Sequence, residues 1–261
     1  MAADFILTLR AKEEGGQQLS EVREDPGPCG ARELIIFIHG FRDNQAKAKN
    51  NWQELRKNIA IDDSGSDVQC GIFLWPSDES NGYWKMIEPA NMAGRKLADY
   101  LLLHPARKTV LIGHSMGARV ALQAAEDLAN TSIKLRGLVL LGAAVRTKEC
   151  EKSQSYGRAH AKREAVGFSK ADRVLKAWFL GEKAAAPLLG KVGNAVGQLG
   201  GPESRDWNRW DSKSADHRYW KFKYSGELAI WALDSSGLIT APAARSPAER
   251  SSEARSLRFA G

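Results

Sequence analysis

A serine flanked at both sides by glycines is the feature of this chain with the clearest chemistry. Residues 113–117 read Gly-His-Ser-Met-Gly and follow the apolar run Thr-Val-Leu-Ile. This spacing is typical of a serine raised on a sharp turn from a strand into a helix, where Gly113 and Gly117 leave room for the backbone. The context favours a reactive turn over a plain glycine-rich one. The sequence predicts that Ser115 is a nucleophile, with the amide of Met116 free beside it.

A second turn supplies candidate donors for a developing negative charge. His39-Gly40-Phe41 follows the apolar run Ile35–Ile38. Gly40 allows backbone amides to face the site, and the amides of Phe41 and Met116 together would form an oxyanion hole. We expect His39 to order this turn rather than to transfer protons.

A serine hydroxyl needs a base, and the chain offers five histidines. His39 and His114 belong to the two motifs above. His104 and His160 each precede a predicted strand, which places them away from the carboxyl ends where ligands of open parallel sheets bind. His217 remains as the predicted base, and the alternative is an ordinary surface or core histidine.

The third group must hold the imidazole in the correct tautomer. Asp172 follows the short apolar run 165–168 and so lies at the carboxyl end of a predicted strand. Its alternative role is to cap the helix that begins after it. Asp211 is the second choice, while Asp216 adjoins His217 in the chain and would rarely reach the right ring nitrogen.

Strand-like and helix-like segments alternate along the chain, which predicts an α/β fold with a mostly parallel central sheet and helices on both faces. The predicted strands are Phe5–Arg10, Glu33–Ile38, Val68–Leu74, Thr109–Ile112, Gly137–Leu141 and Ala165–Phe168. The predicted helices are Gln45–Ile59, Met86–Leu103, Ala118–Asn130 and Val174–Ala186.

Length and composition predict one domain over residues 1–240. Residues 146–163 form a polar insertion unlike the apolar lid of a lipase. Residues 190–202 are rich in glycine and would form either a loop over the site or a surface connection. Residues 241–261 offer little to bury and are predicted to be a disordered basic tail.

The net charge of +7 arises from residues 146–261. It could attract an anionic substrate or the surface of an anionic membrane, and the alternative is a solvated basic face. No sequence motif for binding nucleic acid accompanies this charge.

Three well-separated cysteines indicate reduced thiols in a cytoplasm, without a zinc site, and the expected chemistry needs no metal or cofactor. Composition leaves the oligomeric state open.

With these residues assigned, the chain resembles an α/β-hydrolase from about Leu34 to Trp220. It is most similar to a branch that includes the transmembrane and coiled-coil-domain hydrolase-like proteins. The likeness rests on residues 113–120, 140–143, 169–175 and 197–201 and on His217-Arg218-Tyr219. The resemblance implies a triad on Ser115, Asp172 and His217. The chain lacks the apolar run of the membrane-bound members, so membrane residence is not carried over.

The predicted activity is hydrolysis of a carboxylic ester, in a small molecule or a lipid, through an acyl-enzyme. A thioester, an amide or a phospholipid at an anionic membrane surface would use the same machinery, and a catalytically silent fold that serves as a binding module is the rival class. Seven aromatic residues would line either a substrate pocket or the core. They are Trp75, Tyr83, Trp84, Trp207, Trp210, Tyr219 and Trp220.

Overall fold

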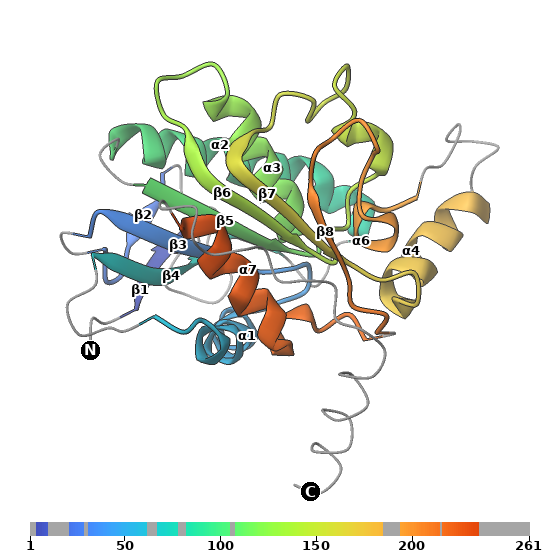
Figure 1. The fold of residues 1–261 in the computed structure, drawn as a ribbon, viewed down its shortest axis with the longest axis horizontal. Helices are drawn as coiled ribbons and strands as arrows, with labels where there is room; N and C mark the ends of the chain where they lie inside the picture. Colours follow the sequence, from blue (N-terminus) through green and yellow to red (C-terminus); the bar gives the residue numbers. More distant parts are fainter. Residues whose placement is uncertain are drawn as a thin grey trace, which may run out of the picture.

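The computed structural model of the chain describes residues 4–9, 21–28, 31–61, 67–77, 82–104, 108–184, 194–214 and 216–234, with the side chains of 180–184 left out. Its centre is an eight-stranded sheet in the order β2-β1-β4-β3-β5-β6-β7-β8, in which all neighbours are parallel except β1 and β2 (Figure 1). The strands are β1 Phe5–Thr8, β2 Arg23–Glu24, β3 Glu33–Ile38, β4 Val68–Leu74, β5 Lys108–His114, β6 Leu135–Leu141, β7 Ala161–Phe168 and β8 Asn208–Asp211.

Helices cover both faces of this sheet (Figure 1). One face carries α2 (Ile87–Leu103) and α3 (Gly117–Leu128), and the other carries α1 (Gln45–Asn58) and α7 (Lys223–Leu233). The remaining helical segments are η1 Tyr83–Met86, η2 Thr147–Cys150, α4 Arg173–Ala184, α6 Val196–Leu199 and η3 Tyr219–Lys221. No helix that the structure describes has both the length and the apolar content to span a membrane.

The central strands are apolar on both sides because both of their faces are covered. In β3, Leu34, Ile36 and Ile38 pack in the core below α2 and α3, whereas Ile35 and Phe37 pack in the core below α1 and α7. This alternation is the two-residue period of a strand, and here both sets of side chains are buried. The continuous run Leu34–Ile38 is therefore a signal of a buried parallel strand.

Strand register brings the candidate residues to the same side of the sheet, at the carboxyl ends of its central strands. Ile38 pairs with Gly113, His114 with Leu141, and Leu141 with Gly167. Each of these strands therefore ends at the same level, and the segments that carry the candidate residues leave from there. This is the edge at which ligands of open α/β sheets bind.

The segment 146–163 is fixed to the body of the protein by buried polar contacts. Arg119 of α3 is buried and donates two hydrogen bonds of 2.9 Å to Glu149 and one of 3.0 Å to the hydroxyl of Tyr156. Cys150 and Tyr156 are themselves buried. The predicted polar insertion is thus a packed connection, and its last three residues already belong to β7.

All six predicted strands and four predicted helices are present, and the mostly parallel sheet is confirmed. β3 and β4 have the predicted bounds, whereas one or both ends of the other predicted elements are shifted. Sequence reasoning missed β2, β8 and α7, and also the short helix α6 (Val196–Leu199) in the stretch that was predicted to be a glycine-rich loop. The two strands are short edge strands, and α7 contains Gly226, where a Cβ would lie 1.9 Å from the carbonyl oxygen of Asn58. That glycine lowers helix propensity but lets α7 approach the end of α1. Residues 190–193, Cys29 and the tail 241–261 lie outside the described residues.

Candidate active site

Ser115 lies on a backbone turn that the two glycines of its motif make possible. Its φ is +53°, a left-handed conformation that is rare for a residue with a side chain. A Cβ at Gly113 would lie 2.5 Å from the Cα of Ala118, and one at Gly117 would lie 2.3 Å from the carbonyl oxygen of Ile38. Neither position can hold a larger residue without a shift of backbone, so the strand-to-helix turn requires both glycines.

The turn at residues 39–41 lies against Ser115. A Cβ at Gly40 would be only 3.1 Å from the Cβ of Ser115. Within the described part of the chain, the amides of Phe41 and Met116 donate no hydrogen bond. The two predicted oxyanion donors are therefore on adjoining turns and available to a ligand.

His39 is an organising residue, and its hydrogen bonds fix its tautomer. The Nε2 atom accepts from the amide of Trp75 at 3.3 Å, so the proton is on Nδ1, which donates to the carbonyl of Gly40 at 3.0 Å. The indole of Trp75 donates in return to the carbonyl of His39 at 2.9 Å. The buried imidazole thus connects the turn at residues 39–41 to Trp75.

Asp43 is a further organising residue that sequence reasoning missed. Its buried carboxylate accepts from the amide of Gly40 at 3.2 Å and from the side chain of Asn51 at 3.3 Å, and it pairs with Lys47 at 2.8 Å. The only local signal for this role was an aspartate close after a glycine in a predicted turn, a residue type that is common in turns. The carboxylate thus holds the turn through the amide of Gly40, whereas His39 holds it through the carbonyl of the same residue.

Asp172 and His217 meet, although 45 residues separate them. The Nδ1–H of His217 donates to Oδ2 of Asp172 at 2.6 Å, and the aspartate is fully buried. The other oxygen, Oδ1, accepts from the amide of Leu175 at 3.0 Å and caps α4. The helix cap and the contact with His217 therefore use separate oxygens of Asp172.

Tyr219 completes the environment of this carboxylate. Its hydroxyl donates to the same Oδ2 atom at 3.2 Å. Burial, and next the charge of Asp172, raises the pKa of Tyr219 well above its usual range, so the hydroxyl keeps its proton. The ring is fully buried, which makes Tyr219 a donor to the acid and not a wall of a substrate pocket.

His217 is held beside the nucleophile turn. A Cβ at Gly142 would lie 3.2 Å from Cε1 of His217, and Gly142 follows Leu141, whose carbonyl accepts from the amide of Ser115 at 3.0 Å. The Nε2 atom of His217 is buried and has no hydrogen-bond partner within the described residues. The structure thus brings Ser115, Asp172 and His217 to one place and leaves the second imidazole nitrogen available.

The side chain of His114 contacts the backbone of His217. Its Nε2–H donates to the carbonyl of His217 at 2.9 Å, and the two rings lie 4.8 Å apart. Burial, with a smaller contribution from His217, lowers the pKa of His114 to about 3. His114 is therefore neutral at physiological pH, and it positions His217 without adding a charge next to it.

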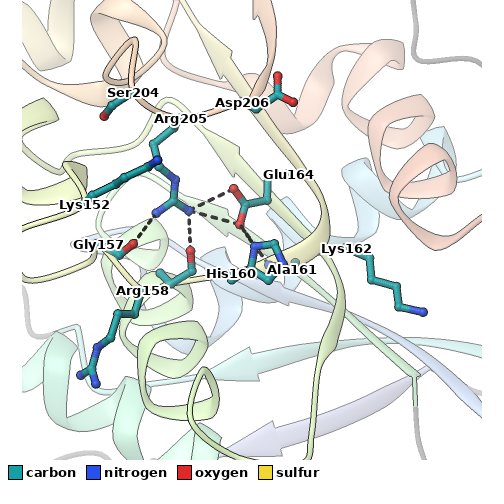
Figure 2. A pocket seen from close by; sticks show the side chains of 11 residues that line it. Lys152, Gly157, Arg158, His160, Ala161, Lys162, Glu164, Ser204, Arg205 and Asp206 are labelled. Atoms are coloured by element: carbon teal, nitrogen blue, oxygen red, sulfur yellow. Dashed lines mark hydrogen bonds and ion pairs between the residues drawn. The ribbon is translucent and has the colours of Figure 1, made fainter.

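The other candidate acids and histidines have different partners. Asp211 accepts from the amide of Lys213 at 3.0 Å, and Asp216 binds the side chain of Arg218 at 2.7 Å. His104 lies 3.9 Å from Glu24. His160 belongs to a separate polar cavity of about 450 Å³ beside the amino end of β7 (Figure 2).

This polar cavity is lined by a largely buried ion pair. Arg205 binds Glu164 at 3.0 Å and donates to the carbonyl of Gly157 at 3.2 Å (Figure 2). It also donates to the carbonyl of Tyr156 at 3.2 Å. Glu164 also accepts from the indole of Trp207 at 2.6 Å. These groups satisfy one another, so we interpret the cluster as a structural anchor for the segment before β7.

Most of the seven aromatic residues belong to the core. Trp75 stacks on His39, and Trp210 stacks on Tyr224, with centroids 5.7 and 4.5 Å apart. Trp84, by contrast, is 39% exposed and touches Tyr83 edge-on at 4.7 Å. Among the seven, a pocket wall is therefore compatible with Trp84, which lies in the connection between β4 and α2.

Backbone strain is concentrated at this edge of the sheet. Within the described residues, the non-glycine positions with left-handed φ are Arg42 at +61°, Ser115 at +53° and Lys213 at +52°. Arg42 follows the proposed oxyanion turn, and Lys213 begins the segment that leads to His217. Such strain costs about 1–3 kcal/mol per residue and clusters at functional sites.

In the described residues, no group of three metal-binding side chains is present.

A family model for an alpha/beta hydrolase of unknown function (DUF900) matches residues 21–196. The chain belongs to this family. The match contains Ser115 and Asp172 and ends before His217, so the predicted base lies outside the matched part. Together with the mostly parallel sheet, it confirms the predicted α/β-hydrolase fold. The finer likeness to transmembrane and coiled-coil-domain hydrolase-like proteins stays a prediction.

Three solved structures illustrate the fold neighbours. A variant of YbtT, a type II thioesterase of yersiniabactin biosynthesis, is 24% identical over 44% of this chain, with a TM-score of 0.31, and the chain spans only 42% of its length. A cutinase-like protein from Cryptococcus sp. is 11% identical (78% of this chain, 93% of that one, TM-score 0.40). An esterase from Pyrobaculum calidifontis is 13% identical (83% and 80%, TM-score 0.42). No curated protein matches the chain by sequence.

Proposed function

We propose that this protein is a serine hydrolase that cleaves a carboxylic ester, or a related acyl bond, through a triad of Ser115, His217 and Asp172. The observation that carries the proposal is the 2.6 Å contact between Asp172 Oδ2 and His217 Nδ1, next to a serine on a left-handed turn. Family membership supports the reaction class, and the substrate is part of the proposal.

The protonation states follow from the hydrogen bonds. Because His217 Nδ1 donates to a buried carboxylate, a neutral imidazole has its lone pair on Nε2. That lone pair takes the proton of Ser115 as Oγ attacks the acyl carbon. Asp172 then stabilises the imidazolium, and the imidazolium returns the proton to the leaving alcohol.

The amides of Phe41 and Met116 bind the oxyanion that forms during this attack. Each such donor is worth about 10²–10³ in rate, since it meets charge that appears only in the transition state. Gly40 carries no side chain between this turn and Ser115, and Asp43 and His39 hold the turn in place. A water molecule activated by His217 then attacks the acyl-enzyme and releases the acid.

Hydrolysis of p-nitrophenyl esters of increasing chain length tests this function. We expect turnover by the wild type and a loss of at least about 10³ in kcat for Ser115→Ala and His217→Ala. Asp216→Asn, which alters the neighbouring acid that binds Arg218, serves as the matched control and keeps its activity. Folded wild-type protein that is inert toward esters, thioesters and amides would refute the proposal and favour a binding module.

A further inference from the structure

An aromatic cluster joins the proposed oxyanion turn to α4. Phe41 contacts Trp178 edge-on with centroids 5.6 Å apart, and Tyr83 lies 5.0 Å from Trp178 and 6.3 Å from Phe41. Trp84 extends the cluster through its 4.7 Å contact with Tyr83. We call these four residues the aromatic wall.

The wall lies next to the reacting serine. The hydroxyl of Tyr83 donates to the carbonyl of Ala144 at 2.5 Å, and the amide of Ala144 donates to the carbonyl of Ser115 at 3.0 Å. At the other side, Phe41 directly follows Gly40, where a Cβ would lie 3.1 Å from the Cβ of Ser115. An acyl group on Ser115 whose oxygen is bound by Phe41 and Met116 would therefore lie against the wall.

Two guanidinium groups border this wall. The guanidinium carbon of Arg42 is 5.2 Å from the ring centre of Phe41 and 5.9 Å from that of Trp178. That of Arg146 is 5.6 Å from the ring centre of Trp84. A cation over a ring face gains from the ring's quadrupole, and the N–H donors of an arginine remain able to bind a carboxylate.

Arg42 is the stronger candidate of the two for binding an anion. Its side chain is exposed, and no carboxylate in the described part of the chain forms an ion pair with it. The neighbouring Asp43 is already paired with Lys47 at 2.8 Å. The left-handed φ of Arg42 also sets its position within the turn that carries the Phe41 amide.

From these contacts we propose that the site selects acyl substrates with a second, terminal carboxylate, which Arg42 binds at the edge of the aromatic wall. The substrate class is then monoesters or monothioesters of dicarboxylic acids. Arg42 acts as a specificity-determining residue: its guanidinium presents paired donors that match a carboxylate. This inference rests on the proposed hydrolase function of Ser115.

The test compares matched substrate pairs. The p-nitrophenyl monoester of a medium-chain dicarboxylic acid is measured against the methyl-terminated ester of the same length, and the ratio of the two kcat/KM values reports carboxylate selectivity. We expect this ratio to fall about five-fold in Arg42→Gln, in line with a partly exposed ion pair, and to shrink in the wild type as salt is added. Arg42→Lys should retain part of the selectivity.

Arg32→Gln is the control for net charge, because Arg32 precedes the amino end of β3, away from the carboxyl ends of the strands, and its side chain is 82% exposed. It should leave the ratio unchanged. An equal ratio in wild type and Arg42→Gln would overturn the inference. If the kcat/KM values for both substrates also fell by the same factor, Arg42 would only pack the turn.

A binding measurement separates this inference from the proposed hydrolase activity. Titration of the free dicarboxylate, followed by tryptophan fluorescence, should give weaker binding to Arg42→Gln than to the wild type by the same factor of about five. If the wild type hydrolyses no ester yet shows this difference, the hydrolase proposal fails and the carboxylate site stands. Equal binding by the two proteins refutes the carboxylate site whatever the esterase result.

Discussion

Asp172→Asn separates the two structural roles of the acid. In the wild type, Oδ1 caps α4 through the amide of Leu175 at 3.0 Å, while Oδ2 accepts from His217 at 2.6 Å and from Tyr219 at 3.2 Å. Asparagine is as good a helix cap as aspartate, so the first contact survives the substitution. The second does not, because an amide NH₂ replaces Oδ2 and faces the Nδ1–H of His217.

The imidazole relieves this donor–donor conflict by moving its proton to Nε2. His217 in that tautomer cannot accept the proton of Ser115. The same substitution in a chymotrypsin-type triad lowers kcat by about 10⁴ through this loss of tautomer, and we expect a loss of about 10³–10⁴ here. Asp172→Ala should lose as much activity and also the cap, which makes it less stable than Asp172→Asn by about 1 kcal/mol.

Ester hydrolysis and urea unfolding of Asp172→Asn, Asp172→Ala and the control Asp216→Asn measure both effects. Asp172→Asn with more than a tenth of the wild-type kcat would refute the role of Asp172 in orienting His217. Equal unfolding free energies for the two Asp172 variants would instead refute the cap.

Three further predictions concern the surroundings of the triad. Gly142→Ala should unfold at a lower temperature and lose more than about ten-fold in kcat/KM, because the φ of Gly142 is +53° and its new Cβ would lie 2.4 Å from the ring of Tyr219. The control Gly82→Ala should match the wild type in thermal melts, because a Cβ at Gly82 would have no atom within 4 Å. Tyr219→Phe should lower kcat by about five-fold in the ester assay, since one hydrogen bond to the catalytic carboxylate is lost, and an unchanged kcat would contradict this. The lowered pKa of His114 means that below pH 6.5 the unfolded chain takes up a proton, while the imidazole in the folded chain stays neutral down to about pH 3. The free energy of unfolding therefore decreases as the pH is lowered through this window, by about 2 kcal/mol at pH 5. Urea unfolding at pH 7 and pH 5 should show a smaller decrease for His114→Gln than for the wild type, whereas the exposed-histidine control His160→Asn should show the wild-type decrease.

The fold and much of the site could be predicted because they depend on signals close together in the sequence. Apolar runs such as Leu34–Ile38 identify buried parallel strands, and the residues that follow them gather at one edge whatever the details of packing. Elimination among five histidines then selects His217, which the structure places against Asp172. Catalytic roles for these residues remain predictions until they are measured.

Contacts between distant side chains could not be predicted from the sequence. The hydroxyl of Tyr219 donates to Asp172, 47 residues earlier in the chain, and no local pattern distinguishes such a tyrosine from a pocket aromatic. Trp178 of α4 likewise contacts Phe41, which is distant from it in the sequence. Arg119 did carry a signal, since a buried arginine on the apolar face of a helix requires an acid, and Glu149 supplies it.

Other predictions lie beyond what the fold addresses. The cytoplasmic location, the affinity of the basic residues 146–261 for anionic membranes and the disorder of residues 241–261 stay predictions. Co-sedimentation with anionic vesicles at low and high salt would test the membrane contact, because screening weakens such binding.

Covalent labelling with a fluorophosphonate tests the central claim most directly, since only an activated serine attacks this phosphorus. Wild-type protein, Ser115→Ala, His217→Ala and Asp216→Asn are incubated with the probe, and the modified residue is located by peptide mass spectrometry. We predict one adduct on Ser115 in the wild type and in Asp216→Asn, and none in the other two variants. Folded wild-type protein that stays unlabelled, or a label on another residue, would contradict the proposed triad.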